Sequence, residues 1–273
     1  MLGKVLTVGI TVFWVTMMAL LTRREILPAY RMAREAEQTP GYAQLEAAAA
    51  KFPVSQMGIY LGSRRIGQTV ARFRKKDNGF LITNETRIGL NLSPAGLFLP
   101  GGTGEINVVL RFKARVVEGQ LNDFQLVATS PPSAEPLAIV DGNPIGDQLK
   151  LRIRQGGQVR TETMPFDAKQ LLANAFGPMM TPSPLRVGMR WAVRTLDPTP
   201  PYALRTAWAS VVRREPILVE GEERPAFLIT IPFAAHEITA WADRDGRILK
   251  QKTFGFTFIR EEPEPEAENS ENP

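Results

Sequence analysis

The sequence contains no cysteine and a single histidine, His236. The absence of cysteine excludes disulfides, thiolate nucleophiles and cysteine-ligated zinc sites. With one histidine, a metal site would depend on carboxylates, and a histidine-activated nucleophile would have one possible base. No serine lies in a G-x-S-x-G motif either. The usual catalytic constellations are therefore missing, and we expect no cofactor and no metal.

Long or dense runs of lysine and arginine are also absent, and the aromatic residues do not alternate with the charges. We therefore expect no nucleic-acid partner. The formal net charge is nevertheless +5, and the six glutamates of residues 261–273 contribute −6, which leaves +11 for the rest of the chain. A basic body can attract anionic lipids or acidic glycans, although a solvated basic surface is the simpler interpretation.

One uncharged apolar run extends from Val5 to Leu21 and would span roughly 26 Å as a helix. A signal-peptide cleavage site requires small residues after such a run, but here bulky residues and then Arg23 and Arg24 follow it. We therefore expect residues 1–22 to be a retained N-terminal transmembrane anchor, with residues 5–22 in the membrane.

Two features of the sequence point to opposite orientations of this anchor. Arginines at 23, 24, 31 and 34 follow the run, and the positive-inside rule would keep the large domain in the cytoplasm. Long domains, however, are translocated largely regardless of charge. Together with a family resemblance given below, this favours a single-pass inner-membrane protein with its C-terminal domain in the periplasm. The cytoplasmic orientation stays open.

Residues 23–53 have the composition of a helical stalk that is interrupted at Pro40-Gly41. After this break, Tyr42–Phe52 contains strong helix formers and one short apolar stripe, Leu45, Ala49 and Phe52. The stripe is too short for a coiled coil, so we expect this helix to pack on its own domain, the alternative being a contact with a partner.

From Val54 to Arg260 the hydrophobic period changes to two, which is typical of strands with one buried and one solvated face. The clearest alternating sets are Phe80, Ile82, Ile88, Leu90 and Leu92; Ile106, Val108, Leu110, Phe112, Ala114 and Val116; and Leu149, Leu151 and Ile153. Turn residues separate such runs at 75–79, 118–119, 155–158 and 243–246. The pattern predicts a mostly β domain with an antiparallel, meandering sheet.

One helix is predicted within this β domain, at Asp167–Phe176, with Asp167 as its cap and Gly177-Pro178 at its end. This helix and the Pro/Met-rich loop after it divide the β region into residues 54–166 and 185–260. We expect one sheet to run through both parts, because the later part has few strands for a core of its own. Residues 261–273 contain only proline, glutamate and small or polar residues, which predicts an acidic disordered tail.

Three segments resemble a group of bacterial envelope domains of unknown function: Met57–Gly67, with its Y-x-x-G-x-x-I-G-like pattern; Leu185–Trp191, with L-x-x-G-x-x-W; and Ile238–Lys250, with W-x-D-x-D-G-x-I-L-K. This group is similar to the β-rich segment that precedes some bacterial transglutaminase cores and to the open half-barrel of periplasmic lipoprotein carriers. The resemblance implies an exported, curved antiparallel sheet, and it brings no active site. We expect an open half-barrel that is covered by one or two helices. The apolar anchor departs from a freely shuttling carrier.

Four features could carry chemistry, and each has a simpler structural interpretation. His236 could act as a base with Glu237 or Asp243, but a lone histidine at the start of a strand is more often structural. Asp243 and Asp245 could bind a cation, but aspartates in hairpins more often bond to the backbone. The tryptophans at 191, 208 and 241 could line a pocket, but core packing is commoner. The glycine-rich 101–104 segment precedes a strand and not a helix, which argues against a phosphate-binding loop.

We therefore expect a non-catalytic envelope module that binds a lipid, a glycan or a partner protein, or acts as a scaffold. The ligand-facing surface predicted from the pattern consists of apolar side chains on one sheet face and in the Met-rich loop: Phe80, Ile82, Ile88, Ile106, Val108, Leu110, Phe112, Met179 and Met180. The alternative is an envelope hydrolase whose paired carboxylates come together only in three dimensions.

Overall fold

The computed structural model divides the chain into two compact units, residues 1–39 and 40–273. It describes Met17, Leu45 and Thr181 and residues 41–42, 50–76, 78–92, 104–133, 135–169, 172–173, 183–197, 203–219, 221–233, 236–253 and 255–261. Apart from Met17, the described residues all belong to the second unit, and the fold described below is the fold of that unit.

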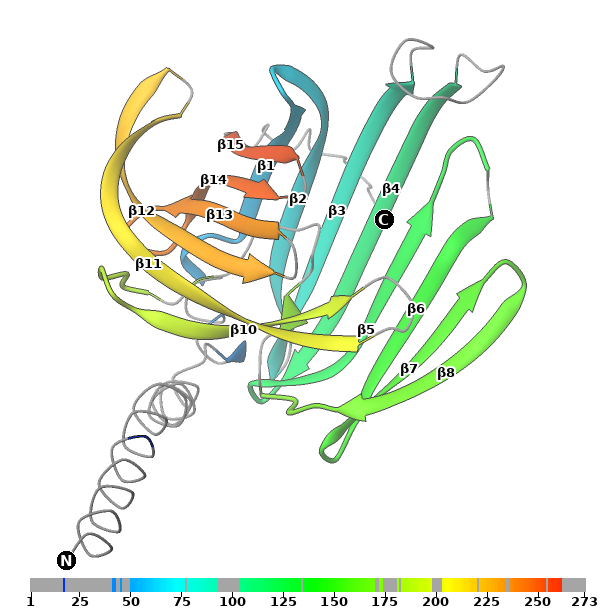
Figure 1. The fold of residues 1–273 in the computed structure, drawn as a ribbon. Coiled ribbons are helices and arrows are strands. Elements are labelled where there is room, and N and C mark those ends of the chain that lie inside the picture. Colours follow the sequence, from blue (N-terminus) through cyan, green and yellow to red (C-terminus); the bar gives the residue numbers. More distant parts are fainter. Residues whose placement is uncertain are drawn as a thin grey trace, which may run out of the picture. The chain divides into compact units, whose positions relative to one another are not determined.

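Among the described residues of this unit, fifteen strands form a single sheet (Figure 1). The first eight are β1 (Val54–Leu61), β2 (Arg64–Lys76), β3 (Gly79–Leu92), β4 (Gly104–Val117), β5 (Gln120–Thr129), β6 (Pro136–Ile145), β7 (Gln148–Gln155) and β8 (Gln158–Pro165). The others are β9 (Leu172–Ala173), β10 (Arg190–Asp197), β11 (Ala203–Val219), β12 (Glu222–Phe233), β13 (His236–Ala242), β14 (Ile248–Thr253) and β15 (Phe256–Glu261).

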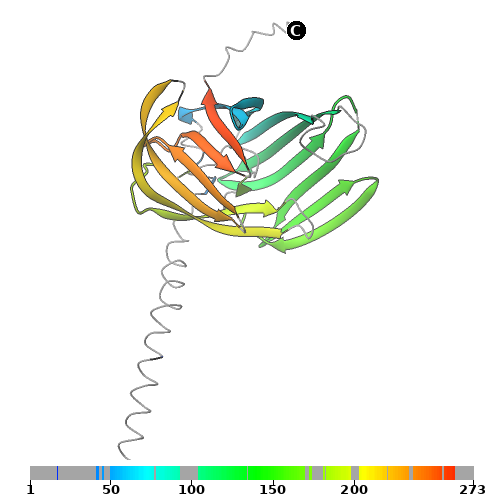
Figure 2. The same ribbon diagram turned by 45° about the horizontal axis from the view of Figure 1, so that its top comes forward.

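The strand order places the beginning and the end of the β region side by side. From one edge to the other the order is β8-β7-β6-β5-β4-β3-β2-β1-β15-β14-β13-β12-β11-β10-β9. In the first half, each strand from β1 to β8 lies one place further from the middle of the sheet. In the second half, each strand from β9 to β15 lies one place nearer to the middle, where β15 pairs with β1. The predicted single sheet is confirmed, and its neighbours are antiparallel except for the short parallel pair β9–β10. Figures 1 and 2 show the sheet as curved.

The predicted turns at 118–119 and 155–158 are present. Glu118 and Gly119 have positive φ values of 51° and 71°, as do Gly156 and Gly157 with 57° and 76°. Two consecutive residues with positive φ form the tight turn whose twist matches antiparallel strands. The structure therefore confirms that glycine-containing turns connect β4 to β5 and β7 to β8.

The register separates the residues of the sheet into an inner face, which carries two buried hydrophobic clusters, and an outer face. The first cluster lies on β3–β8 and includes Phe80, Ile82, Ala114, Phe124, Leu149 and Leu151. The second lies on β1 and β10–β15 and includes Met57, Ile59, Trp191, Ile229, Ala240 and Phe258. Alternation is clear on β7, where Leu149, Leu151 and Ile153 are buried while Lys150 and Arg152 are exposed.

The helix predicted at residues 167–176 is wrong for the part of it that the structure describes. Ala168 and Lys169 form a turn, and Leu172–Ala173 is strand β9, which pairs with β10. Asp167 accepts a hydrogen bond from the backbone N–H of Lys169 (3.0 Å), so it closes an Asx turn and caps no helix. The carbonyl of Ala168 accepts a bond from the N–H of Leu121 on β5 (2.8 Å). Pairing with the sheet thus outweighs the local helix propensity of this segment.

Part of the predicted stalk helix packs on the sheet. Tyr42 and Leu45 have helical backbones, and both belong to the first buried cluster, with 1% and 7% of their surface exposed. The N–H of Tyr42 also donates to the carbonyl of Lys169 (3.3 Å). The structure therefore favours packing of this helix on its own domain over a contact with a partner.

The predicted anchor lies outside the described residues, apart from Met17. Within the described part of the chain, no helix is both long and apolar enough to cross a membrane. The predicted acidic segment, residues 261–273, begins inside the sheet, because Glu261 is the last residue of β15 and pairs with Gln56. Residues 262–273 lie outside the part that the structure describes.

Candidate functional site

Among the predicted ligand-facing residues, some side chains are fully buried and others are half-buried. Phe80 and Ile82 are only 3% and 4% exposed, because they form part of the first buried cluster. They therefore belong to the packed core and leave no surface for a ligand. The other described members, Ile88, Val108, Leu110 and Phe112, are half-buried. The side chains of Ile106, Met179 and Met180 lie outside the described part.

These four half-buried side chains form one strip on the inner face, which we call the inner strip. Ile88 lies opposite Val108 in the β3–β4 register, and Leu110 and Phe112 follow on β4. Ile88 packs against the second cluster, whereas Phe112 packs against the first. The Phe112 ring also lies 5.8 Å from that of Phe124, in a tilted pair. The inner strip therefore lies between the two clusters, and neither cluster covers it completely.

A buried polar group lies beside the inner strip. Thr86 is directly opposite Leu110 on one side and Thr69 on the other. The hydroxyls of Thr69 and Thr86 are 2.8 Å apart, and the Asn84 amide donates to Thr69 Oγ1 (2.9 Å). Thr86 in turn donates to Asn84 Oδ1 (3.2 Å). Because their side chains bond to one another, these polar residues can occupy the inner face without a large desolvation cost.

The outer face of the same strands carries charge. Glu85 accepts hydrogen bonds from Arg87 Nε (2.6 Å) and from Arg111 Nε (3.0 Å). Partial burial raises the pKa of Glu85, but the bonds and charges of the two arginines outweigh this effect and hold it below its usual value. Arg115 pairs with Asp123, and Arg154 pairs with Asp141. The outer face thus carries several arginine–carboxylate ion pairs. These pairs contain four arginines and three carboxylates.

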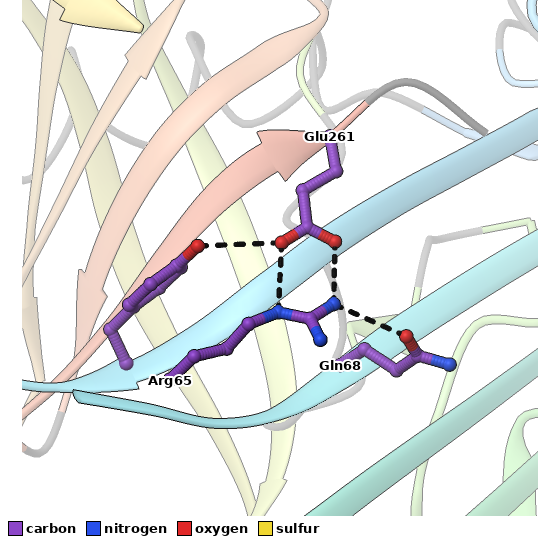
Figure 3. A network of polar contacts seen from close by, with 4 residues as sticks. Arg65, Gln68 and Glu261 are labelled. Atoms are coloured by element: carbon purple, nitrogen blue, oxygen red, sulfur yellow. Dashed lines mark hydrogen bonds and ion pairs between the residues drawn. The ribbon is translucent and has the colours of Figure 1, made fainter. Parts of the chain in front are cut away.

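A four-residue polar network marks the end of β15 on the outer face (Figure 3). Arg65 donates from Nε to Glu261 Oε1 (3.0 Å) and from Nη2 to Glu261 Oε2 (2.8 Å), a two-pronged contact. Gln68 Oε1 accepts from the same guanidinium (3.3 Å), and the Tyr60 hydroxyl donates to Glu261 (3.4 Å). A Cβ atom on Gly58 would lie 2.1 Å from Glu261 Oε1, so glycine at 58 leaves the space that the carboxylate occupies.

One arginine is almost fully buried in the sheet. Arg260 is 8% exposed and donates to the Ile248 carbonyl (2.8 Å) and to the Ser55 hydroxyl (3.2 Å). Burial, and secondly the charge of Arg247, lower the pKa of Arg260 to about 10, against the opposing effect of Asp243. Its bonds to neighbouring strands make it a structural group that ties β15 to β14 and β1.

The isolated candidates from the sequence have structural roles where the structure describes them. Asp243 Oδ1 accepts from the Arg247 N–H (2.9 Å), which closes the β13–β14 turn, and Asp245 pairs with Lys51 (3.4 Å). Trp191 is 1% exposed in the second cluster. Trp241 donates from its indole nitrogen to Glu215 (2.6 Å), and this bond, followed by that of Arg213, holds the pKa of Glu215 below its usual value.

Two further candidates are described only through their backbones. His236 is the first residue of β13 and pairs with Phe233, while its side chain lies outside the described part. Gly104 begins strand β4, as expected for a segment that is not a phosphate-binding loop. Within the residues that the structure describes, no three acidic or histidine side chains are grouped so that they could hold a metal ion.

No family model matches the chain, and no curated protein matches it. Among solved structures, the chain is similar to the crystal structure of a β-barrel-like protein of the domain of unknown function DUF1849 from Brucella abortus. The two share 10% sequence identity over 76% of this chain and 93% of that one, with a TM-score of 0.47. The resemblance to envelope domains and lipoprotein carriers therefore stays a hypothesis.

Proposed function

We propose that this protein is a membrane-anchored, non-catalytic binding module whose curved sheet, an open half-barrel, receives the acyl chain of a lipid on its inner strip. The observation that carries the proposal is the half-burial of Ile88, Val108, Leu110 and Phe112 between two closed cores. Apolar side chains in the middle of long strands are normally buried, so a contiguous set that is only half-buried leaves apolar surface for a ligand.

The neighbouring polar group gives this strip a second property. Thr69, Asn84 and Thr86 place hydroxyl and amide groups beside an apolar surface. These groups are at most 6% exposed and bond to one another, so they support the strip from within, and the surface that a ligand meets is apolar. An acyl chain fits such a surface better than a sugar does, because the strip offers no hydrogen bonds.

Two carboxylates of the described part, Glu85 and Glu215, are unsuited to act as the general acid of a hydrolase. A general acid at neutral pH needs a raised pKa. Glu85 and Glu215 instead have lowered pKa values, because arginines and an indole N–H bond to their charged forms. These pairs support structural roles for Glu85 and Glu215 as ionised carboxylates.

The proposed location follows from the apolar run at residues 5–22. This anchor would hold the domain at the inner membrane on its periplasmic side, where membrane lipids are within reach. A reporter enzyme that is active only after export, fused after Pro273, is expected to be active. An inactive fusion that is expressed at normal levels would place the domain in the cytoplasm.

Lipid binding can be tested with the compact unit of residues 40–273 and a fluorescent long-chain fatty acid. Leu110→Glu should weaken binding by tenfold or more, because it places a charge in the middle of the inner strip. Val109→Glu is the matched control, since Val109 is also half-buried but points to the opposite face. Failure of the unmodified unit to bind the probe, or to release lipid on organic extraction, would overturn the proposal and leave a scaffold, glycan or protein partner.

A further inference from the structure

The outer face of β2–β7 has a large excess of positive charge. Its described cations are Arg65, Arg72, Arg74, Lys76, Arg87, Arg111, Lys113, Arg115, Lys150, Arg152 and Arg154, and its described acids are Glu85, Asp123 and Asp141. Ion pairs join these three acids to arginines. Arg74, Lys113 and Arg152 are exposed and have no acidic side chain within 4 Å among the described residues. This face is therefore suited to an extended anionic partner.

The carboxylate of Glu261 is already bound on this face. It lies over Gly58 in the two-pronged contact with Arg65 that Figure 3 shows. Glu261 is also the first of six glutamates at the end of the chain, followed by glutamates at 262, 264, 266, 268 and 271, with no lysine or arginine among them. The first glutamate of the acidic segment is therefore bound to an arginine of the outer face.

The direction of β15 leads toward a row of cations. Because Gln56 pairs with Glu261 in an antiparallel register, β15 runs toward the end of β1 that carries Val54. Val54 pairs with Arg72, and the same row continues across the sheet through Thr83, Lys113, Gln125, Asp141 and Arg152. Glu261 lies two residues before this row, in the row of Val70, Glu85 and Arg111, and β15 points from there toward the row of Arg72, Lys113 and Arg152.

The length of the segment is sufficient for this row. Residues 262–273 can extend about 40 Å at roughly 3.3–3.6 Å per residue. Strands lie about 4.8 Å apart, so Lys113 on β4 is about 19 Å from β15, and Lys150 on β7 is about 34 Å from it. Several glutamates can therefore meet several cations at once, and tethering raises their effective concentration at the sheet.

We propose that the outer face of β2–β7 is a binding surface for a glutamate-rich polypeptide, and that its occupant is the C-terminal segment of the same chain, residues 262–273. In this arrangement Glu261 and Arg65 fix the start of the segment. The glutamates beyond them neutralise Lys113 and Arg152 of that row. External polyanions then bind this face only in competition with the segment.

Carbodiimide crosslinking of the full chain tests this contact directly, because the reagent joins a carboxylate to a lysine amine with loss of water. Mass spectrometry should find glutamates of residues 262–271 linked to Lys113 and Lys150. Lys169 lies in the connection after β8 and is the internal control, which should remain unlinked to these glutamates. The links should decrease severalfold in 0.5 M salt, since screening weakens contacts between exposed charges.

A second measurement uses the chain without residues 262–273 and a labelled peptide of that sequence. The shortened chain should bind the peptide, and Lys113→Glu with Arg152→Glu should weaken binding at least tenfold. Arg186→Glu with Arg224→Glu changes the net charge equally outside β2–β7 and should leave binding within twofold. Absence of links to Lys113 and Lys150, together with absence of peptide binding, would overturn the proposal. Binding of polyglutamate that is unchanged by the deletion would instead assign the face to an external partner.

Discussion

At the residue scale, Gly246 shows how a single backbone angle can be tested. It has a φ of 82° in the turn between β13 and β14, and its N–H donates to the carbonyl of Asp243 (3.1 Å). A β-branched side chain is strained at positive φ. Gly246→Val should therefore lower the free energy of unfolding by about 1–2 kcal/mol, measured as a shift of the urea midpoint. Arg244→Ala, at an exposed position of the same turn, should change it by less than about 0.5 kcal/mol.

Glu85 gives the outer face a predictable dependence on pH. Its folded-state pKa is lowered by Arg111 and Arg87, so its contribution to stability is complete above the unfolded pKa of about 4.3. The contribution is lost as the pH falls through the lower, folded-state value. Glu85→Gln should therefore be less stable than the unmodified protein at pH 6, and this difference should shrink toward pH 3. Equal differences in the denaturation midpoint at both pH values would contradict the assignment.

Residue identity alone predicts only some of these roles. The positive φ at Gly246 and the backbone bond of Asp243 follow from ordinary turn chemistry, and both are present. The inner-face positions of Asn84 and Thr86 could not be predicted from residue type. Their side chains are hydrogen-bonded on this face, Asn84 to Thr69 on the neighbouring strand and Thr86 to Asn84 two residues away. The space that Gly58 leaves for Glu261 depends on the β1–β15 pairing, which joins residues far apart in the chain.

At the element scale, strands with one closed face were the most predictable. On β7, the alternation of Leu149, Leu151 and Ile153 with charged residues gives both the strand and its buried face. The segment after β8 was the least predictable, because its composition favours a helix while its partners lie on β5 and β10. Among the predicted site residues, the pattern could place Phe80 and Leu110 on one face. The pattern could not show that Phe80 is buried while Leu110 is only half-buried, since burial depends on packing across the sheet.

The segment before β1 belongs to the fold although it lies outside the alternating region. Tyr42 and Leu45 fill the first cluster, so a chain that begins at Pro40 should unfold at a higher denaturant concentration than one that begins at Val54. Within the longer chain, Tyr42→Ala should cost about 3 kcal/mol, as expected for truncation of a buried aromatic residue. Lys51→Ala, at an exposed position, is the control. Equal midpoints for the two chains would mean that this helix contributes nothing to the core.

At the scale of the whole unit, pairing of β1 with β15 makes one sheet out of two halves that wind in opposite directions. The first buried cluster lies on β3–β8, and the second lies mostly on β1 and β10–β15. The Thr69–Asn84–Thr86 group and the inner strip connect the clusters across β2–β4. The proposed lipid site therefore lies between the two clusters, and ligand binding there should stabilise both of them together.

This arrangement predicts a single cooperative unfolding transition for residues 40–273. Tryptophans 191, 208 and 241 all lie on β10–β13, so tryptophan fluorescence reports on the second half, whereas circular dichroism reports on all strands. Leu149 is fully buried in the first cluster, and Leu149→Ala should cost about 2–5 kcal/mol. If the sheet unfolds as one unit, this substitution lowers the fluorescence midpoint as much as the dichroism midpoint, although no tryptophan lies near Leu149 in the sheet order. A fluorescence midpoint that stays unchanged while the dichroism signal separates into two steps would show that the halves fold independently, and the inner strip would then be a boundary between two domains.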